Sequence, residues 1–119
     1  MKIRFNNGTE VPYIEAINEN GYMNGVNRQV LSVHIAKGVI GVDELDAILS
    51  DENNTQHIEL IGDEVTNVFD DYILKNKVGV EKVLIENETP DAPTLYEERI
   101  VFELGRLTYI EKRLKSLGL

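Results

Sequence analysis

The 119-residue chain is 42% hydrophobic, a length and composition that favour one folded domain with its own core. It contains no cysteine, which excludes disulfides, thiol catalysis and cysteine-ligated zinc. The net charge of -9 is unevenly distributed, because residues 41–71 carry ten acidic side chains and no lysine or arginine, while residues 104–119 carry four basic side chains and one acidic one. We expect no nucleic-acid partner, since phosphate binding requires a basic patch, and no membrane partner, since no apolar run reaches the ~18 residues of a span.

The first expected element is a β-hairpin in "KIRFNNGTEVPY", at residues 2–13. Ile3 and Phe5 share one face of its first strand, and the pair Asn7-Gly8 predicts a tight two-residue turn with positive φ angles. Pro12 cannot donate to a strand ladder, so we expect it at an edge or at a strand end.

The middle of the chain predicts two strands and a short helix. Residues 18–27 contain two further Asn-Gly pairs and are expected to form a turn-rich excursion. "RQVLSVHIAKG" and "HIELI" alternate apolar and polar residues like half-buried strands, and "VDELDAILS" predicts a short helix, with Asp43 as its N-cap, that must dock on a sheet. The side chains expected to point inward are Leu31, Val33 and Ile35, then Leu45, Ile48 and Leu49, and finally Ile58 and Leu60.

The second half continues with strands. Residues 65–86 are rich in valine, isoleucine and aromatic residues and predict two strands that divide after Lys77. "NETPDAPTL" predicts a loop, and "YEERIVFEL" predicts the last strand, with Ile100, Phe102 and Leu104 on one face. The expected fold is a single α+β domain over residues 1–106, built from a mainly antiparallel β-sheet with one short packed helix, followed by a C-terminal helix over residues 107–119.

The C-terminal helix is the expected packing or assembly element. Its apolar residues are spaced three, four and three apart, which is typical of the narrow seam of a coiled coil, and two heptads are too short to be stable without a partner surface. That surface is either the rest of the same chain or a neighbouring subunit. The acidic segment 41–71 is either a solvated face or a surface that pairs with a basic partner, which could be the basic tail of a neighbouring copy. The predicted interaction residues are Leu107, Ile110, Leu114, Leu117 and Arg113.

The acid- and amide-rich run "SDENNT" raises the question of a calcium loop. Asp51, Asn53 and Thr55 place oxygens at the first, third and fifth positions, but Gln56 replaces the required glycine and Gly62 the required glutamate. Hydrogen bonds between these polar side chains and the nearby backbone explain the run better, so we expect it to be a turn that connects the short helix to the next strand. The two histidines have no histidine neighbour at ligand spacing, and no catalytic motif is present. We therefore expect no catalytic, cofactor-binding or metal-binding residues and no enzymatic activity.

Three stretches carry a resemblance to a known group of proteins: "NNGTE" in the opening hairpin, "SDENNT" after the short helix, and "YILK" in a later strand. With these, the chain resembles small proteins from the tail and baseplate gene modules of tailed bacteriophages and prophages of Gram-positive bacteria. The resemblance implies a non-enzymatic structural or assembly protein that binds other virion proteins or itself as a homo-oligomer. It also implies the bacterial cytoplasm during assembly, or the virion, as its location.

The longer final helix departs from that pattern, and we connect it with assembly. The alternative interpretation is a small ligand- or metal-binding regulatory domain of a bacterial cytoplasmic protein.

Overall fold

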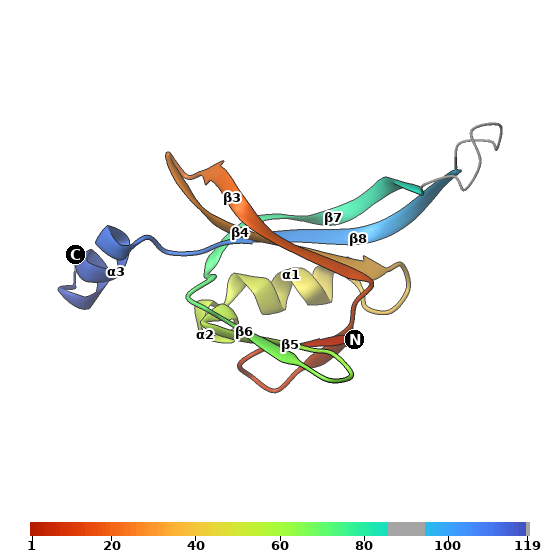
Figure 1. Cartoon of the computed structure of the whole chain (residues 1–119), viewed down its shortest axis with the longest axis horizontal. Coiled ribbons are helices and arrows are strands. Elements are labelled where there is room, and N and C mark those ends of the chain that lie inside the picture. Colours follow the sequence, from red (N-terminus) through yellow and green to blue (C-terminus); the bar gives the residue numbers. More distant parts are fainter. Residues whose placement is uncertain (86–94, 119) are drawn as a thin grey trace.

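The structure, a computed structural model, describes residues 1–85 and 95–118 (Figure 1). Its elements are β1 (Lys2–Arg4), β2 (Glu10–Pro12), β3 (Glu15–Met23), β4 (Val26–Ala36), α1 (Val42–Ser50), α2 (Glu52–Thr55), β5 (His57–Ile61), β6 (Thr66–Asp70), β7 (Leu74–Ile85), β8 (Leu95–Gly105) and α3 (Tyr109–Ser116). The strands form two four-stranded antiparallel sheets, sheet A with the order β2-β1-β5-β6 and sheet B with the order β3-β4-β8-β7. The expected α+β class is confirmed, with the strands divided between two sheets and α1 between them (Figure 1).

The opening hairpin is confirmed, but its turn differs from the prediction. Phe5 and Thr9 close a three-residue loop, in which the Phe5 N–H donates to the Thr9 carbonyl and the Gly8 N–H to the Phe5 carbonyl, both at 2.9 Å. Only Gly8 has a positive φ in this loop, at 91°, so the geometry is a turn followed by a left-handed glycine and not a two-residue turn. Pro12 lies on the edge strand β2, as expected.

The prediction of a turn-rich excursion at residues 18–27 is wrong. Most of it belongs to β3, which pairs with β4 along its full length, and only Asn24 and Gly25 form a turn. Their φ angles of 52° and 84° are those of a two-residue hairpin turn. The other Asn-Gly pair lies inside β3, because pairing with β4 satisfies its backbone groups and outweighs its local turn preference.

Helix α1 lies where the sequence predicts it but begins differently. Gly41 is the N-cap, without a side-chain hydrogen bond, so the prediction of Asp43 as the cap is wrong. Asp43 instead lies in the first turn, where its charge interacts favourably with the helix dipole. Leu45 and Leu49 are fully buried, as the helical spacing predicts.

The chain crosses from sheet A to sheet B at residues 71–73, and not after Lys77 as predicted. Asp71 has a positive φ of 67° there, and Tyr72 and Ile73 are buried in the crossing. The apolar character continues through the crossing, so composition alone does not reveal the break. The predicted loop with Pro90 and Pro93 lies at residues 86–94, outside the described residues.

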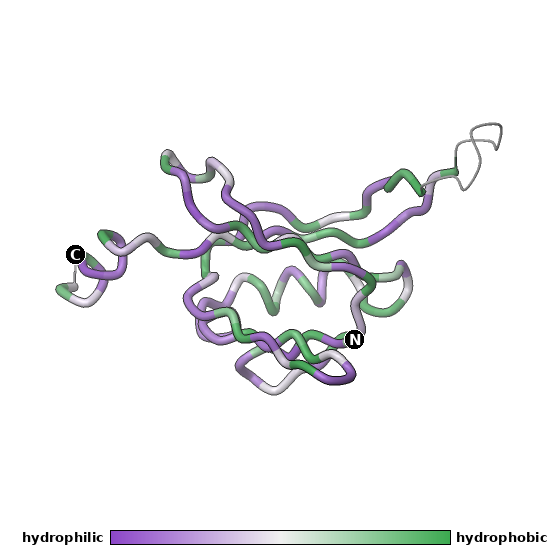
Figure 2. Tube along the Cα trace, in the orientation of Figure 1, coloured by the Kyte–Doolittle hydropathy of each residue, from purple (hydrophilic) through white to green (hydrophobic). Residues whose placement is uncertain are grey.

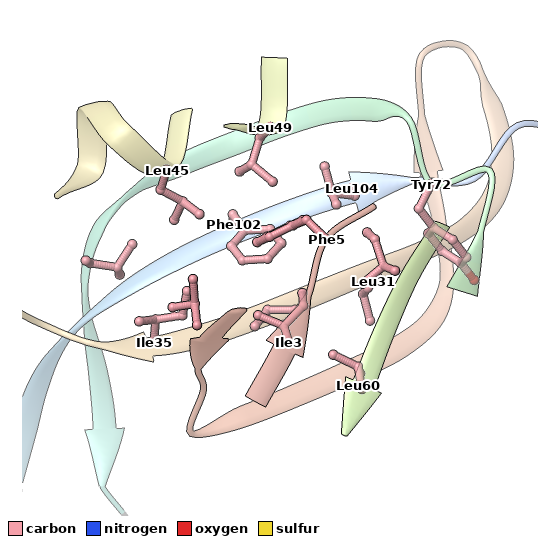
Figure 3. Packing of buried hydrophobic residues seen from close by; sticks show 14 residues of the cluster. Ile3, Phe5, Leu31, Ile35, Leu45, Leu49, Leu60, Tyr72, Phe102 and Leu104 are labelled. Atoms are coloured by element: carbon pink, nitrogen blue, oxygen red, sulfur yellow. The ribbon is translucent and has the colours of Figure 1, made fainter. Parts of the chain in front are cut away.

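The core fills the space between the two sheets (Figure 3). Phe5 from the first hairpin lies against Phe102 of β8, with ring centroids 6.3 Å apart. The apolar stretches in Figure 2 follow the strands and α1 that contribute to it. The buried members of the core are Ile3, Phe5, Val11, Leu31, Val33, Ile35, Leu45, Leu49, Ile58, Leu60, Tyr72, Ile100, Phe102 and Leu104.

Gly105 ends β8 at the most crowded point of sheet B. It pairs with Val30 of β4 on one side and Leu74 of β7 on the other. A Cβ at this position would lie 2.5 Å from the Met23 sulfur and 3.0 Å from the Arg28 Cδ. The close approach of these side chains therefore requires glycine.

We expect Gly105→Ala to lower the free energy of unfolding by about 1–3 kcal/mol, because the added methyl group overpacks the site. Gly79→Ala is the matched control, since a Cβ there meets nothing within 4 Å and Gly79 also lies in a strand of sheet B. Urea unfolding of both variants measures the difference. Equal midpoints for Gly105→Ala and the parent chain would show that the site has room for the methyl group.

Candidate functional site

Helix α3 is defined by its own capping interactions. Thr108 is the N-cap, and its hydroxyl accepts a hydrogen bond from the Glu111 N–H at 3.3 Å. The Glu111 carboxylate in turn accepts from the Thr108 N–H at 2.8 Å, which completes a capping box. The helix therefore begins at Tyr109, two residues after Leu107, which was expected to be part of it.

A buried arginine ties α3 to the body of the protein. The Arg28 side chain is 1% exposed, and its Nε donates to the Met23 carbonyl at 2.9 Å while Nη1 donates to the Arg106 carbonyl at 3.0 Å. Nη1 and Nη2 also donate to the two carboxylate oxygens of Glu111, at 2.5 and 3.1 Å. Such bidentate contacts fix orientation as well as position. The Arg28 guanidinium, with help from the Thr108 N–H, lowers the pKa of Glu111 to about 2.

Two more ion pairs connect α3 to the acidic segment. Lys112 lies 3.0 Å from the Asp71 carboxylate, and Lys115 lies 2.9 Å from the Glu52 carboxylate. All four side chains are partly exposed, so each pair contributes little stability. The basic tail thus pairs with the acidic segment of its own chain, whereas the sequence suggested the tail of a neighbouring copy.

The apolar residues of α3 face away from that attachment. Ile110, Leu114 and Leu117 are 70%, 45% and 64% exposed, and their spacing places them on one side of the helix. Lys112 and Lys115, which pair with the body, lie on the opposite side at 100° per residue, and Glu111 lies at the flank, about 60° from Leu114. We call Ile110, Leu114 and Leu117 the α3 stripe.

The α3 stripe contains three of the five predicted interaction residues. Arg113 is exposed beside the stripe, and within the described residues it makes no ion pair. Leu107 is half-buried before the helix begins, and its N–H donates to the Asp71 carbonyl at 3.0 Å. The predicted seam is therefore shorter than four residues, because Leu107 belongs to the connection that leads into α3.

Sequence reasoning missed the anchor of this site. The pattern Thr-x-x-Glu at residues 108–111 is a recognisable capping-box signal and could have located the start of α3. Arg28 offers no comparable signal, because a single arginine in a strand gives no indication that it is buried. One partner, Met23, lies in the same hairpin, and the other two, Arg106 and Glu111, lie about eighty residues further on and reach Arg28 only through the fold.

A cleft of about 500 Å³ separates α3 from the body beneath the two lysine pairs. Glu52, Asn53 and Gln56 line it on the α2 side, and Leu107 and Ser116 line it on the α3 side. The walls mix acidic, basic, amide and apolar groups. The cleft exists because α3 is attached by long polar side chains and buries no residue of its own.

The "SDENNT" run lies directly beside this cleft and shows the expected turn chemistry. The Asp51 carboxylate accepts from the Asn53 N–H at 3.0 Å and caps α2, a single helical turn. The Asn54 side chain donates to the Ile48 carbonyl at 3.0 Å at the end of α1, and the Asn54 carbonyl accepts from the Asn6 N–H. Across residues 1–85 and 95–118, no three His, Asp or Glu side chains gather in a geometry that could hold a metal ion.

His57 is part of an ion-pair ladder on the exposed face of sheet A. Its Nδ1 lies 2.7 Å from the Asp70 carboxylate and its Nε2 lies 3.5 Å from the Glu59 carboxylate. The hydrogen bond to Asp70 raises the pKa of His57 above its ordinary value, since it favours the protonated ring. This is ordinary surface pairing, as expected for a histidine at a polar strand position.

Comparisons of the chain with protein-family models, with curated proteins and with solved structures found no match. Among the helices of the described residues, none has both the length and the apolar composition needed to cross a membrane.

The Glu111 carboxylate should titrate near pH 2, because its pKa in the folded protein is about 2 and its ordinary value is 4.5. A lowered folded pKa means that the contribution of the carboxylate is complete above about pH 4.5 and is lost as the pH falls through about 2. Carboxyl-carbon NMR gives the midpoint directly. Amide exchange of residues 109–116, corrected for intrinsic rates, should accelerate over the same range in the parent chain but not in Glu111→Gln. A midpoint near 4.5 would mean that Arg28 does not hold this group.

Proposed function

We propose that this chain is a non-enzymatic interaction protein of phage or prophage type, with a structural or assembly role in a tail or baseplate. Its contact element is α3, and its partners are proteins. The observation that carries the proposal is the orientation of this helix, which attaches to the body by its charged side and turns the α3 stripe toward solvent.

The orientation of α3 is the reverse of the usual arrangement for a helix at the surface of a globular protein, where the apolar side is buried. Docking on the charged side leaves three large apolar side chains in water at a free-energy cost that a partner surface would remove. Arg28 and Glu111 maintain this arrangement, since their bidentate contact holds one side of the helix against the body.

The assignment to a tail or baseplate rests on the resemblance carried by "NNGTE", "SDENNT" and "YILK". The structure gives these stretches separate places, in the first hairpin, around α2 and at the start of β7. The location that follows is the bacterial cytoplasm during assembly, or the virion.

A regulatory domain that binds a small ligand or metal is the second candidate. The cleft between α2 and α3 favours it, since ligand sites are concave and combine apolar walls with a few polar groups. The two candidates differ in what should occupy the region around α3: a protein on its exposed stripe, or a small molecule beneath it.

A photo-crosslinking amino acid in place of Leu114 tests the first candidate in the bacterium that carries the gene. We expect covalent adducts with a tail or baseplate protein or with a second copy of this chain, identified by mass spectrometry. The same amino acid in place of Val65, which is exposed in the β5–β6 turn, is the matched control and should yield none. The flanking genes should encode tail or baseplate proteins. The absence of adducts specific to residue 114, or adducts with a metabolic enzyme, would contradict the proposal.

Calcium separates the second candidate from the first. We expect no saturating heat when calcium is titrated into the protein to roughly millimolar concentration, because the Asp51 carboxylate already accepts a capping hydrogen bond, and Gln56 and Gly62 replace the turn glycine and the bidentate glutamate of a calcium loop. Calorimetry on the parent chain and on Asp51→Ala measures this. A one-to-one heat that is lost in Asp51→Ala would favour the regulatory domain.

A further inference from the structure

Three asparagines of this chain are each followed directly by glycine. The pairs are Asn7-Gly8, Asn20-Gly21 and Asn24-Gly25. Asparagine before glycine is the dipeptide most prone to deamidation, because glycine has no side chain to hinder an attack by its backbone nitrogen or to restrict the backbone rotation that the attack needs. The three pairs share this local chemistry, so the fold decides which of them reacts.

Deamidation requires an accessible N–H on the glycine. A base removes the proton from this N–H, the nitrogen forms a bond to the Cγ of the asparagine, and the bond from Cγ to the side-chain nitrogen breaks, so that ammonia leaves and a succinimide ring remains. An N–H that donates a hydrogen bond is withheld from base, as it is in amide hydrogen exchange. The hydrogen bonds of each pair therefore rank the three sites.

The first pair is held in the loop of the opening hairpin. The Gly8 N–H donates to the Phe5 carbonyl at 2.9 Å, so the attacking nitrogen is already bound. The Asn7 side-chain oxygen accepts from the Thr9 N–H at 2.9 Å, which fixes the group that would be attacked. Phe5 belongs to the buried core, so this loop is tied to an anchored residue.

The second pair is held inside a strand. Gly21 pairs with Arg28 in the ladder between β3 and β4, and the Asn20 side-chain oxygen accepts from the Gln29 amide at 2.6 Å. A Cβ on Gly21 would lie 3.1 Å from the Val30 side chain, so the backbone runs close against its neighbour. Ring closure at Asn20 would have to disrupt this pairing.

The third pair forms the turn at the projecting end of the β3–β4 hairpin (Figure 1). Both residues are exposed, and within residues 1–85 and 95–118 neither the Gly25 N–H nor the Asn24 side chain makes a hydrogen bond. Asn24 has a φ of 52°, a left-handed conformation that residues other than glycine adopt at a cost. Ring closure rotates the Asn24 backbone out of this conformation, and a Cβ on Gly25 would meet nothing within 4 Å, so the turn has room for the rotation.

We propose that Asn24 is the site of spontaneous deamidation in the folded protein, and that the fold protects Asn7 and Asn20. Water opens the succinimide by breaking one of its two bonds to the Gly25 nitrogen. Attack at Cγ gives aspartate, and attack at the main-chain carbonyl carbon gives isoaspartate, in which the main chain runs through the side chain and is one methylene longer. Both products add one negative charge to the turn. This inference is independent of the proposed function.

Chymotryptic mapping of the folded chain after ageing in mildly alkaline buffer tests the proposal. Cleavage after Tyr13 and Tyr22 places the three pairs in three different peptides, and mass spectrometry with fragmentation locates each deamidated residue. We expect aspartate and isoaspartate to accumulate at Asn24. Asn7 and Asn20 should react at least about tenfold more slowly, because their glycine N–H groups become accessible only when the anchored loop or the strand pairing opens.

The same ageing in urea, which unfolds the chain, is the control for the effect of the fold. The three rates should then become similar, since only local chemistry remains. Asn24→Gln is the control for the site, because its longer side chain closes the ring far more slowly, and the folded variant should form almost no isoaspartate. A folded chain in which Asn24 reacts no faster than Asn7 or Asn20, or rate ratios that are the same in urea and in the folded state, would overturn the inference.

Discussion

The buried guanidinium of Arg28 is the constraint on which the position of α3 depends. A charged group removed from water is tolerated only where its donors are satisfied and its charge is balanced. Its Nε–H and both of its Nη groups find acceptors in Met23 beside the β3–β4 turn, in Arg106 after β8, and in Glu111 of α3. Few orientations of α3 would place a carboxylate where it accepts from both Nη groups of Arg28. This ion pair therefore determines how the helix is oriented.

This electrostatic attachment explains why the charged side of α3 faces the body and its apolar side faces solvent. The glutamate that meets Arg28 also completes the capping box with Thr108, so the first turn of the helix and its contact with the body share one side chain. Glu111 lies only about 60° from Leu114 around the helix, so the ion pairs of Lys112 and Lys115 are also needed to turn the apolar side outward. The exposed apolar surface is therefore a consequence of the charged contacts between α3 and the body taken together.

The two-sheet architecture confines the core to the central part of the molecule and leaves α3 at one end (Figure 1). Sheet A and α1 cover only the central part of sheet B, where Phe5 meets Phe102. The strands β7 and β8 are longer than that cover, and in their outer part Lys82 and Glu98 pair on the face that covers the core closer to the body. On the other side β8 ends at Gly105, and the chain continues through residues 106–108 into α3.

The alternation of apolar residues was sufficient to predict much of this fold. Leu31, Val33 and Ile35 in β4 point inward as predicted, and so do Ile100, Phe102 and Leu104 in β8, because a period of two assigns a strand to one buried face wherever the sheet lies. Local signals failed where long-range pairing outweighed them. The pair Asn20-Gly21 lies in a strand because β4 satisfies its backbone, and the crossing at Asp71 was hidden by continuous apolar composition.

The sequence by itself determined the class of fold, the faces of the central strands, the short helix α1, the turn chemistry after it and the apolar spacing in α3, since each depends on residues close together in the chain. Only the tertiary structure decided which side of α3 faces the body. That choice depends on Arg28, which lies 83 residues from Glu111, and on a salt bridge formed in a site that exists only after β4 and β8 have paired. A spacing of three and four residues indicates that a helix has an apolar side. Whether that side is buried depends on the partners that the fold brings to the other side.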